Sequence, residues 1–310
     1  MKVCILLAAY NGAAYIRQQI DSILQQDYPN IQLVLSDDGS QDGTQEILAE
    51  YQERYPDRII WYQSGERFGK PQTHFMHLLR QFHDAPYIMF SDQDDVWHSD
   101  KVSKTLKKMR EIETDTNIPA LVHTDLRVVD RDLNIKAKSF CEYSNINGNR
   151  LKLNQLLVQN VVTGCTVMVN RALAECSCVN ISSEVIIMHD WWMAMLASAC
   201  GAAGFLNETT IDYRQHGSNS VGAQKVSSPQ YLWKRLSTKK KMRDALTTAA
   251  KQAESFFACY EHMIGTKEKN VIQAFVSIKN KGTLGRDVVF LRYHLLKDRI
   301  IRIVPQLLGL

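Results

Sequence analysis

The sequence has few of the features that mark secreted, membrane-spanning or nucleic-acid-binding proteins. Its seven cysteines include no CxxC pair, and their odd number and irregular spacing do not make a disulfide framework, so we expect reduced thiols in a cytoplasmic protein. No stretch approaches the roughly 20 consecutive apolar residues that a transmembrane helix needs. The formal net charge is only +4, without the excess of basic residues that nucleic-acid binding uses, so we expect no nucleic-acid partner. With 45% hydrophobic residues, the chain can still bury a large core.

The first apolar run, at residues 3–9, is much shorter than the hydrophobic region of a secretory signal, and we interpret it as a β-strand. Strand and helix patterns then alternate along the first third of the chain. Predicted strands lie at 2–9, 31–35, 59–62 and 87–90, and predicted helices at 15–25, 44–55, 73–82 and 101–113, the last with a charged face expected to be exposed. This alternation predicts an α/β fold with a mostly parallel central sheet flanked by helices.

Carboxylates follow two of these predicted strands. Asp37 and Asp38 end the second, and Asp92, Asp94 and Asp95 follow the fourth. In a parallel sheet both clusters lie at the same edge, where ligands bind. Such closely spaced negative charges need a cation, and Mg²⁺ or Mn²⁺ would also bring phosphate oxygens. The alternative for each cluster is a solvated acidic turn.

A later carboxylate, Asp190, opens a predicted apolar helix that runs to about residue 200. The free N–H groups and the dipole of the first turn stabilise a carboxylate there, so Asp190 either accepts a proton in a reaction or simply caps the helix. Trp191 and Trp192 follow it. Paired aromatic faces beside a carboxylate suit sugar-ring recognition, and we expect one of the two to pack in the core.

The composition changes towards the C-terminus. Residues 211–222 form a polar segment interpreted as a loop that holds His216, and a lone loop histidine is more often solvated than a ligand. A helix is predicted at 245–262 and a basic amphipathic helix at 286–310. That last helix either lies on an anionic membrane or docks on the protein body or on a second copy. We expect a catalytic domain at 1–225 and a helical C-terminal extension at 226–310, with a homo-oligomer through the C-terminal helices as one arrangement.

Taken in order, these motifs resemble family 2 glycosyltransferases of the GT-A, Rossmann-like fold. The resemblance covers about residues 1–222 and rests on five segments: Leu7–Gly12, Ser36–Ser40, Ser91–Trp97, Gly164 and its neighbours, and His189–Trp192. The acidic run with its trailing Val-Trp is also similar to that of bacterial rhamnosyltransferases of polysaccharide assembly, such as lipopolysaccharide or capsule.

The resemblance implies a role for each site residue. Ala9 and Asn11 would line the nucleotide pocket, and Asp38 would accept a hydrogen bond from the pyrimidine base. Asp92 and Asp94 occupy the family's DxD motif, with Asp95 adjacent, and which two of the three touch the ion stays open. We assign Asp92 to donor binding and Asp94, Asp95 and His216 to the metal. Asp190 matches the family's general base.

The implied reaction is inverting transfer from a nucleotide diphosphate sugar to a saccharide or lipid-linked acceptor. Because no QxxRW motif is found, we expect addition of one sugar at a time. Loops at about 131–165 and 205–225 are expected to select the donor and the acceptor. A metal-dependent nucleotidyltransferase and a nucleotide-sugar-binding protein without turnover are the alternatives. The expected location is the cytoplasm, with peripheral contact on the inner face of the membrane.

Overall fold

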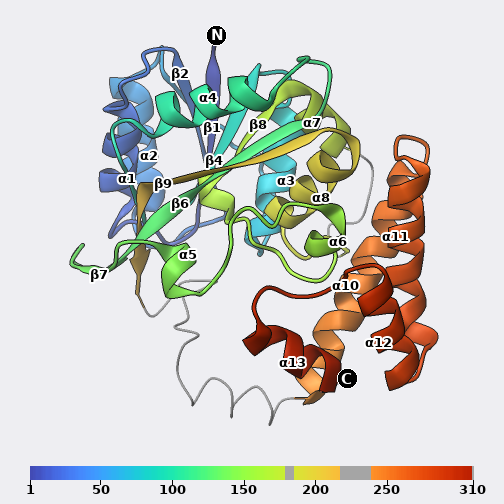
Figure 1. The fold of residues 1–310 in the computed structure, drawn as a ribbon. Coiled ribbons are helices and arrows are strands. Elements are labelled where there is room, and N and C mark those ends of the chain that lie inside the picture. The colour runs from blue at the N-terminus through green and yellow to red at the C-terminus, as the bar shows by residue number, and fades with distance from the viewer. Residues whose placement is uncertain (179–184, 217–238, 309–310) are drawn as a thin grey trace.

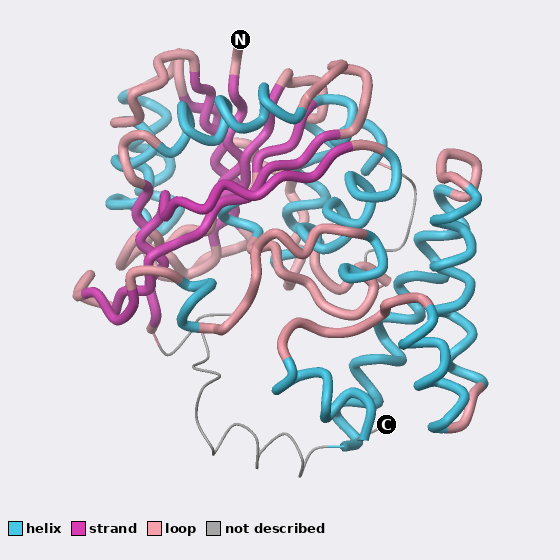
Figure 2. The backbone as a smooth tube through the Cα atoms, viewed as in Figure 1, coloured by secondary structure: helices cyan, strands magenta, loops and turns pink. Residues whose placement is uncertain are grey.

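The computed structural model describes residues 1–178, 185–216 and 239–308. Within them, one central sheet is covered by helices on both faces (Figures 1 and 2). Its strands are β1 (Val3–Ala9), β2 (Ile31–Asp37), β3 (Ile59–Trp61), β4 (Tyr87–Ser91), β5 (Val96–Trp97), β6 (Ala120–Asp130), β7 (Ile135–Ala137), β8 (Met168–Asn170) and β9 (Ala202–Gln215).

The helices follow from apolar residues at helical spacing that face this sheet. They are α1 (Ile16–Leu24), α2 (Thr44–Arg54), α3 (Pro71–Phe82), α4 (Lys101–Ile112), α5 (Phe140–Tyr143), α6 (Leu153–Leu156), α7 (Arg171–Ser177), α8 (His189–Cys200), α10 (Lys239–Tyr260), α11 (Thr266–Ser277), α12 (Thr283–Arg292) and α13 (Ile300–Leu308). Alternate residues of β1 pack on opposite faces, Ile5 and Leu7 with α1 and α2, and Leu6 with α3. Each face of the sheet therefore has its own apolar core.

The first half of the sheet is parallel, as the sequence predicts. The strand order begins β3-β2-β1-β4, and β1 runs parallel to both neighbours. In that register Ala9 lies beside Asp37, and Leu7 beside Ser91. Both acidic clusters consequently leave the sheet at one edge, on either side of the end of β1.

The second half of the sheet differs from the sequence prediction. Strand β8 runs antiparallel to β4 and β6, and the long β9 pairs parallel with β6 as far as Gln215. The interpretation of 211–215 as loop was wrong. Polar residues interrupt the period-2 pattern of β9, and pairing with β6 determines its structure; the Asp212 carboxylate, for example, binds Arg127 across the strands.

The C-terminal helices share a hydrophobic core with the first part of the chain. On α10, Ala253, Phe256 and Tyr260 are buried in the same core cluster as Trp192 of α8. Figure 1 shows α10 to α13 together, on the side of the molecule away from β1 and β2. The predicted domain boundary at 225/226 lies outside the described residues.

The predicted single helix over 286–310 was wrong. Helix α12 ends at Arg292 and α13 begins at Ile300. Between them, His294 and Arg299 have left-handed backbone conformations with φ of 52° and 64°. Residues 293–299 contain no glycine or proline, so the sequence pattern did not predict a break in the helix there. Among the described helices, none is long and apolar enough to cross a membrane.

Candidate active site

The three carboxylates after β4 sit in different surroundings. Asp95 is fully buried, and its Oδ1 accepts a hydrogen bond of 3.0 Å from the backbone N–H of Arg214. Asp92 and Asp94 are half-buried. Oxygens of Asp92 and Asp95 and the sulfur of Cys165 all lie within 4.8 Å of one another. The run is therefore a folded cluster rather than a solvated turn.

The electrostatics of this cluster call for a cation. Burial, and after it the charges of Asp94 and Asp190, raise the pKa of Asp92 to about 7. Burial and the neighbouring carboxylates also raise the pKa of Asp95 well above its ordinary value. The Oδ2 atom of Asp95 is buried without a hydrogen-bond partner among the described residues. Carboxylate oxygens and an orphaned buried acceptor fit a hard divalent cation. Burial raises the pKa of the Cys165 thiol well above its ordinary value.

The end of β9 reaches the same cluster. The Nε2 atom of His216 lies 2.7 Å from Oδ2 of Asp94, and its ring stacks on Tyr15 with 4.9 Å between centroids. The structure thus brings His216 to the acidic run. The alternative of a solvated loop histidine does not describe His216.

Arg214 is a supporting residue to which sequence reasoning gave no role. It is almost fully buried, and its Nε donates to the backbone carbonyl of Asp94 at 2.7 Å. Its other nitrogens donate to the carbonyl of Arg131 and to Gln18, and its guanidinium lies over Tyr15. In the sequence, the feature that could have identified Arg214 is its position two residues before the candidate ligand His216.

Lys101, at the start of α4, was also missed, because that helix's charged face was expected to be exposed. Lys101 is fully buried, and its Nζ has no hydrogen-bond partner among the described residues. It lies 4.5 Å from the ring centroid of Trp97. Burial lowers the pKa of Lys101 to about 7, against the opposing influence of Cys165 and Asp95. A buried amine therefore lies within electrostatic range of Asp95 in the acidic cluster.

The residues expected to bind the nucleotide meet where β1 and β2 end. The backbone N–H of Asp38 donates to the carbonyl of Ala9 at 2.8 Å. Asn11 has a left-handed backbone with φ of 49°, and its N–H donates to Ser40. Both carboxylate oxygens of Asp38 already accept backbone N–H groups from the 68–69 segment. Asp38 thus holds that segment next to the expected nucleotide pocket.

Gln93 joins the nucleotide end to the acidic run. Its Oε1 accepts from the backbone N–H of Tyr10 at 2.6 Å, and its Nε2 donates to the carbonyl of Tyr10 at 2.9 Å. A Cβ at Gly12 would lie only 2.4 Å from Oε1 of Gln93, so glycine is required for this contact. The two loops are fixed relative to each other by these two bonds.

Asp190 completes the cluster from α8. Its Oδ1 accepts hydrogen bonds from the backbone N–H of Trp191 and, at 3.1 Å, from Nδ2 of Asn160. Burial nevertheless raises the pKa of Asp190 to about 7, and the hydrogen bonds from Trp191, Asn160 and the backbone of Gly164 oppose this shift. Because Asp190 influences the pKa of Asp92, the two carboxylates share one electrostatic site. A carboxylate with a pKa near neutrality can take up and release a proton under physiological conditions.

The residues around Asp190 hold it by close packing. His189 is buried between Phe75 and Phe90, at ring-centroid distances of 4.5 and 5.1 Å. A Cβ at Gly164 would lie 2.8 Å from Nε2 of His189 and 3.5 Å from Oδ2 of Asp190. Glycine at position 164 is thus what lets the preceding loop approach the start of α8.

The two tryptophans after Asp190 have different surroundings. Trp192 is fully buried in the core and donates from Nε1 to the hydroxyl of Tyr260 at 3.2 Å. The prediction that one of them packs in the core is confirmed for Trp192. Trp191 is half-buried, and its indole N–H donates to the carbonyl of Leu156 at 2.6 Å.

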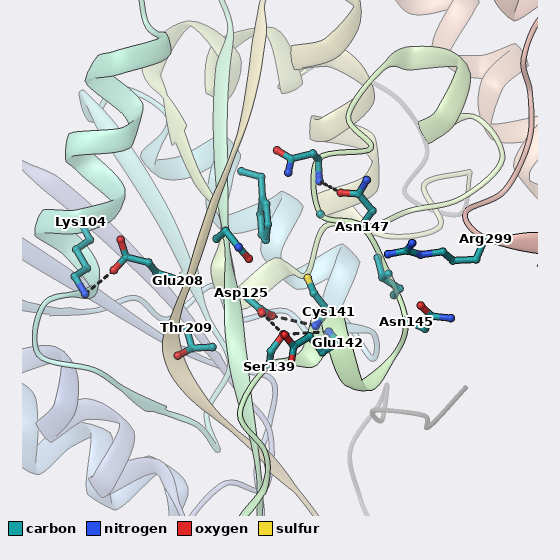
Figure 3. Close-up of a pocket in the computed structure, with 15 residues that line it drawn as sticks. Lys104, Asp125, Ser139, Cys141, Glu142, Asn145, Asn147, Glu208, Thr209 and Arg299 are labelled. Carbon is teal, nitrogen blue, oxygen red and sulfur yellow. Dashed lines mark hydrogen bonds and ion pairs between the residues drawn. The ribbon is translucent and has the colours of Figure 1, made fainter. Parts of the chain in front are cut away.

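A polar cavity of about 850 Å³ lies apart from these carboxylates, beside β6 and β9 (Figure 3). Several of its residues come from the loops expected to select donor and acceptor. Two of its acidic side chains are paired: Ser139 donates to Asp125 at 2.5 Å, and Lys104 pairs with Glu208 at 2.7 Å. None of the candidate catalytic or metal-binding residues lines this cavity. The candidate site residues therefore lie in the acidic cluster and not in the cavity.

Comparison with known proteins agrees with this arrangement. The family model described as glycosyl transferase family 2 matches residues 4–177, more than half of the chain. The chain belongs to glycosyl transferase family 2. It is accordingly a glycosyltransferase, and Asp38 and Asp92–Asp95 lie within the residues that the family model matches.

Two curated relatives cover most of this family 2 chain. A dTDP-rhamnosyl transferase, RfbG of Shigella flexneri, is 29% identical over 227 residues, which is 70% of this chain and 74% of the relative. TuaG of Bacillus subtilis, a putative teichuronic acid biosynthesis glycosyltransferase, is 27% identical over 74% of this chain and 85% of its own length.

Solved structures share the fold at low sequence identity. S. aureus TarS in complex with UDP has a TM-score of 0.56 at 13% identity, over 95% of this chain and 91% of that one. A mannosyltransferase of Pyrobaculum calidifontis in complex with GDP-Man and Mn²⁺ has a TM-score of 0.52 at 17% identity, over 99% and 87%. These similarities support the predicted GT-A fold.

Proposed function

We propose that this glycosyltransferase moves one sugar from a nucleotide diphosphate sugar to a saccharide or lipid-linked saccharide acceptor, with inversion, in the synthesis of a surface polysaccharide. Residues 1–225 carry the reaction, and 226–310 support it. Rhamnose is the donor sugar to test first, because of the likeness to RfbG.

The observation that carries the proposal is the pairing of two functions in one electrostatic site. Asp92 and its neighbours form a cluster that needs a cation, and Asp190, whose pKa is about 7, acts on Asp92 from helix α8. An inverting transferase needs this pair of functions. One group neutralises the leaving diphosphate, while the other accepts the proton of the attacking hydroxyl.

The acidic run is the proposed place of a Mg²⁺ or Mn²⁺ ion. Asp92, Asp94 and Asp95 supply the carboxylate oxygens, and His216 lies on Asp94 at 2.7 Å. When bound, such an ion neutralises the charge that develops on the diphosphate. The unpartnered Oδ2 of Asp95 is the free acceptor that supports this assignment.

Asp190 is the proposed general base. Its ionised carboxylate takes the proton from the acceptor hydroxyl as that hydroxyl attacks C1 of the donor sugar. The hydrogen bonds from Trp191 and Asn160 orient the carboxylate. Asp38, Ala9 and Asn11 form the proposed nucleotide end of the site.

The test is a screen of nucleotide sugars, with dTDP-rhamnose first, for metal-dependent release of nucleoside diphosphate. Release of pyrophosphate instead would identify a nucleotidyltransferase and reject the proposal. In calorimetry, Asp94→Ala is expected to abolish Mn²⁺-dependent donor binding. Unchanged nucleotide affinity in that variant would count against the metal site. The matched control is Asp100→Ala, because the Asp100 side chain is 42% exposed and lies outside the cluster. This variant should keep Mn²⁺-dependent donor binding.

A further inference from the structure

Exposed apolar side chains concentrate on the last two helices. On α12, Leu284, Val288 and Leu291 are 83%, 62% and 55% exposed. Their spacing of four and three residues places them on one face of the helix. The adjacent Val289 and Phe290 are buried, so α12 is docked through its other face. The exposed stripe is therefore a surface of a packed helix and does not result from loose packing.

Helix α13 continues this pattern in an unusual way. Ile300 and Val304, four residues apart, are 76% and 43% exposed. The inward side of the helix carries buried polar side chains beside the buried Pro305 and the half-buried Leu307. Buried Arg302 donates to the backbone carbonyls of the 144–145 segment, and buried Gln306 donates to the carbonyl of Leu295 at 2.8 Å. Ile300 and Val304 therefore remain as apolar side chains on the outward side of α13.

The exposed charges of residues 281–304 have one sign. Every exposed charged side chain between residues 281 and 304 is basic, namely Lys281, Arg292 and Arg299. The two acids of that stretch are not exposed, since Asp298 is buried and Asp287 is half-buried. Apolar side chains bordered by cations are complementary to the interfacial layer of an anionic bilayer.

We propose that these residues form a membrane-docking surface for anionic lipid. We call it the C-terminal apolar face: Leu284, Val288, Leu291, Ile300 and Val304, bordered by Lys281, Arg292 and Arg299. It differs from the basic helix expected from the sequence, because Arg286 and Arg302 are buried and take no part. The inference deepens the proposed function and rests on it for its purpose, which is to keep the enzyme beside a lipid-linked acceptor.

The experiment is sedimentation of the full chain with vesicles at low salt. Vesicles of phosphatidylcholine with phosphatidylglycerol are compared with phosphatidylcholine alone. We expect binding to the anionic vesicles, little to the neutral ones, and a loss of about tenfold or more in L284S/V288S/L291S and in K281E/R292E. The matched control is I118S/I135S, which replaces isoleucines that are 40% and 54% exposed elsewhere, and it should bind as the wild type does.

Several results would overturn the proposal. These are no binding of the wild type to anionic vesicles, equal binding to neutral vesicles, or serine variants that bind unchanged. A dimer that L284S/V288S/L291S dissociates, without vesicle binding, would assign the face to a second copy of the chain. Donor hydrolysis is measured separately without lipid. A failed docking surface is thereby distinguished from a failed transferase assignment.

Discussion

Asn160 provides a direct test of Asp190 as the general base. Its Nδ2 donates to Oδ1 of Asp190 at 3.1 Å and so favours the ionised carboxylate, while burial favours the protonated acid. Asn160→Ala removes that donor and leaves the backbone N–H of Trp191 in place. The pKa of Asp190 should therefore rise from its value of about 7.

The size of the effect follows from the hydrogen bond. A hydrogen bond to a charged group contributes roughly 1.5–3 kcal/mol, or about 1–2 pKa units. We take about one unit, because Trp191 still donates. Only the ionised base is active, so the midpoint should move from about pH 7 to about pH 8. Turnover should then fall about fivefold at pH 7 and remain nearly unchanged at pH 9.

The assay is the initial rate of nucleoside diphosphate release from pH 5.5 to 9.5, with donor, acceptor and metal saturating. Asn160→Asp places a second carboxylate beside Asp190 and should move the midpoint further than alanine does. An equal loss at every pH would refute the electrostatic reasoning and leave Asn160 a structural role in its bonds to Val162. A wild-type profile without a limb near pH 7 would reject Asp190 as the base.

Three further substitutions test the site. Asp190→Asn should keep donor binding by calorimetry while turnover falls by a factor of about 10² to 10⁴. The folded-state pKa of Asp190 is raised from 3.8 to about 7. The contribution of Asp190 to the free energy of unfolding is therefore present at low pH and is lost as the pH rises through 7. At pH 8, Asp190→Asn should consequently melt no lower than the wild type. Gly164→Ala should displace His189 and Asp190 and so lower kcat. The control is Gly282→Ala, where a Cβ meets nothing within 4 Å, and its kcat should stay at the wild-type value. Equal rates in the two variants would contradict the packing argument. Arg214→Lys cannot reproduce the planar guanidinium contacts and should lower both the melting temperature and Mn²⁺-dependent donor affinity, and a variant with neither loss would remove Arg214 as the support of the acidic run.

Local patterns were enough to predict the first half of the fold. The apolar residues of β1, β2 and β4 and of the helices between them recur at regular strand or helix spacing, and parallel pairing then brings both acidic clusters to one edge. The later elements were harder to predict because their structure depends on partners. Strand β9 has a polar middle, and the break before α13 comes at residues 294–299 without glycine or proline.

The sequence by itself determined the order of the motifs, the α/β class and the identity of the carboxylates, because each is carried by residue types and spacing within a short segment. Only the tertiary structure decided which of these residues meet. Asp190 and His216 lie far along the chain from Asp92–Asp95, and long-range packing brings α8 and β9 to the end of β4. Burial then sets the pKa values of Asp92 and Asp190 near 7, and burial belongs to the folded chain as a whole.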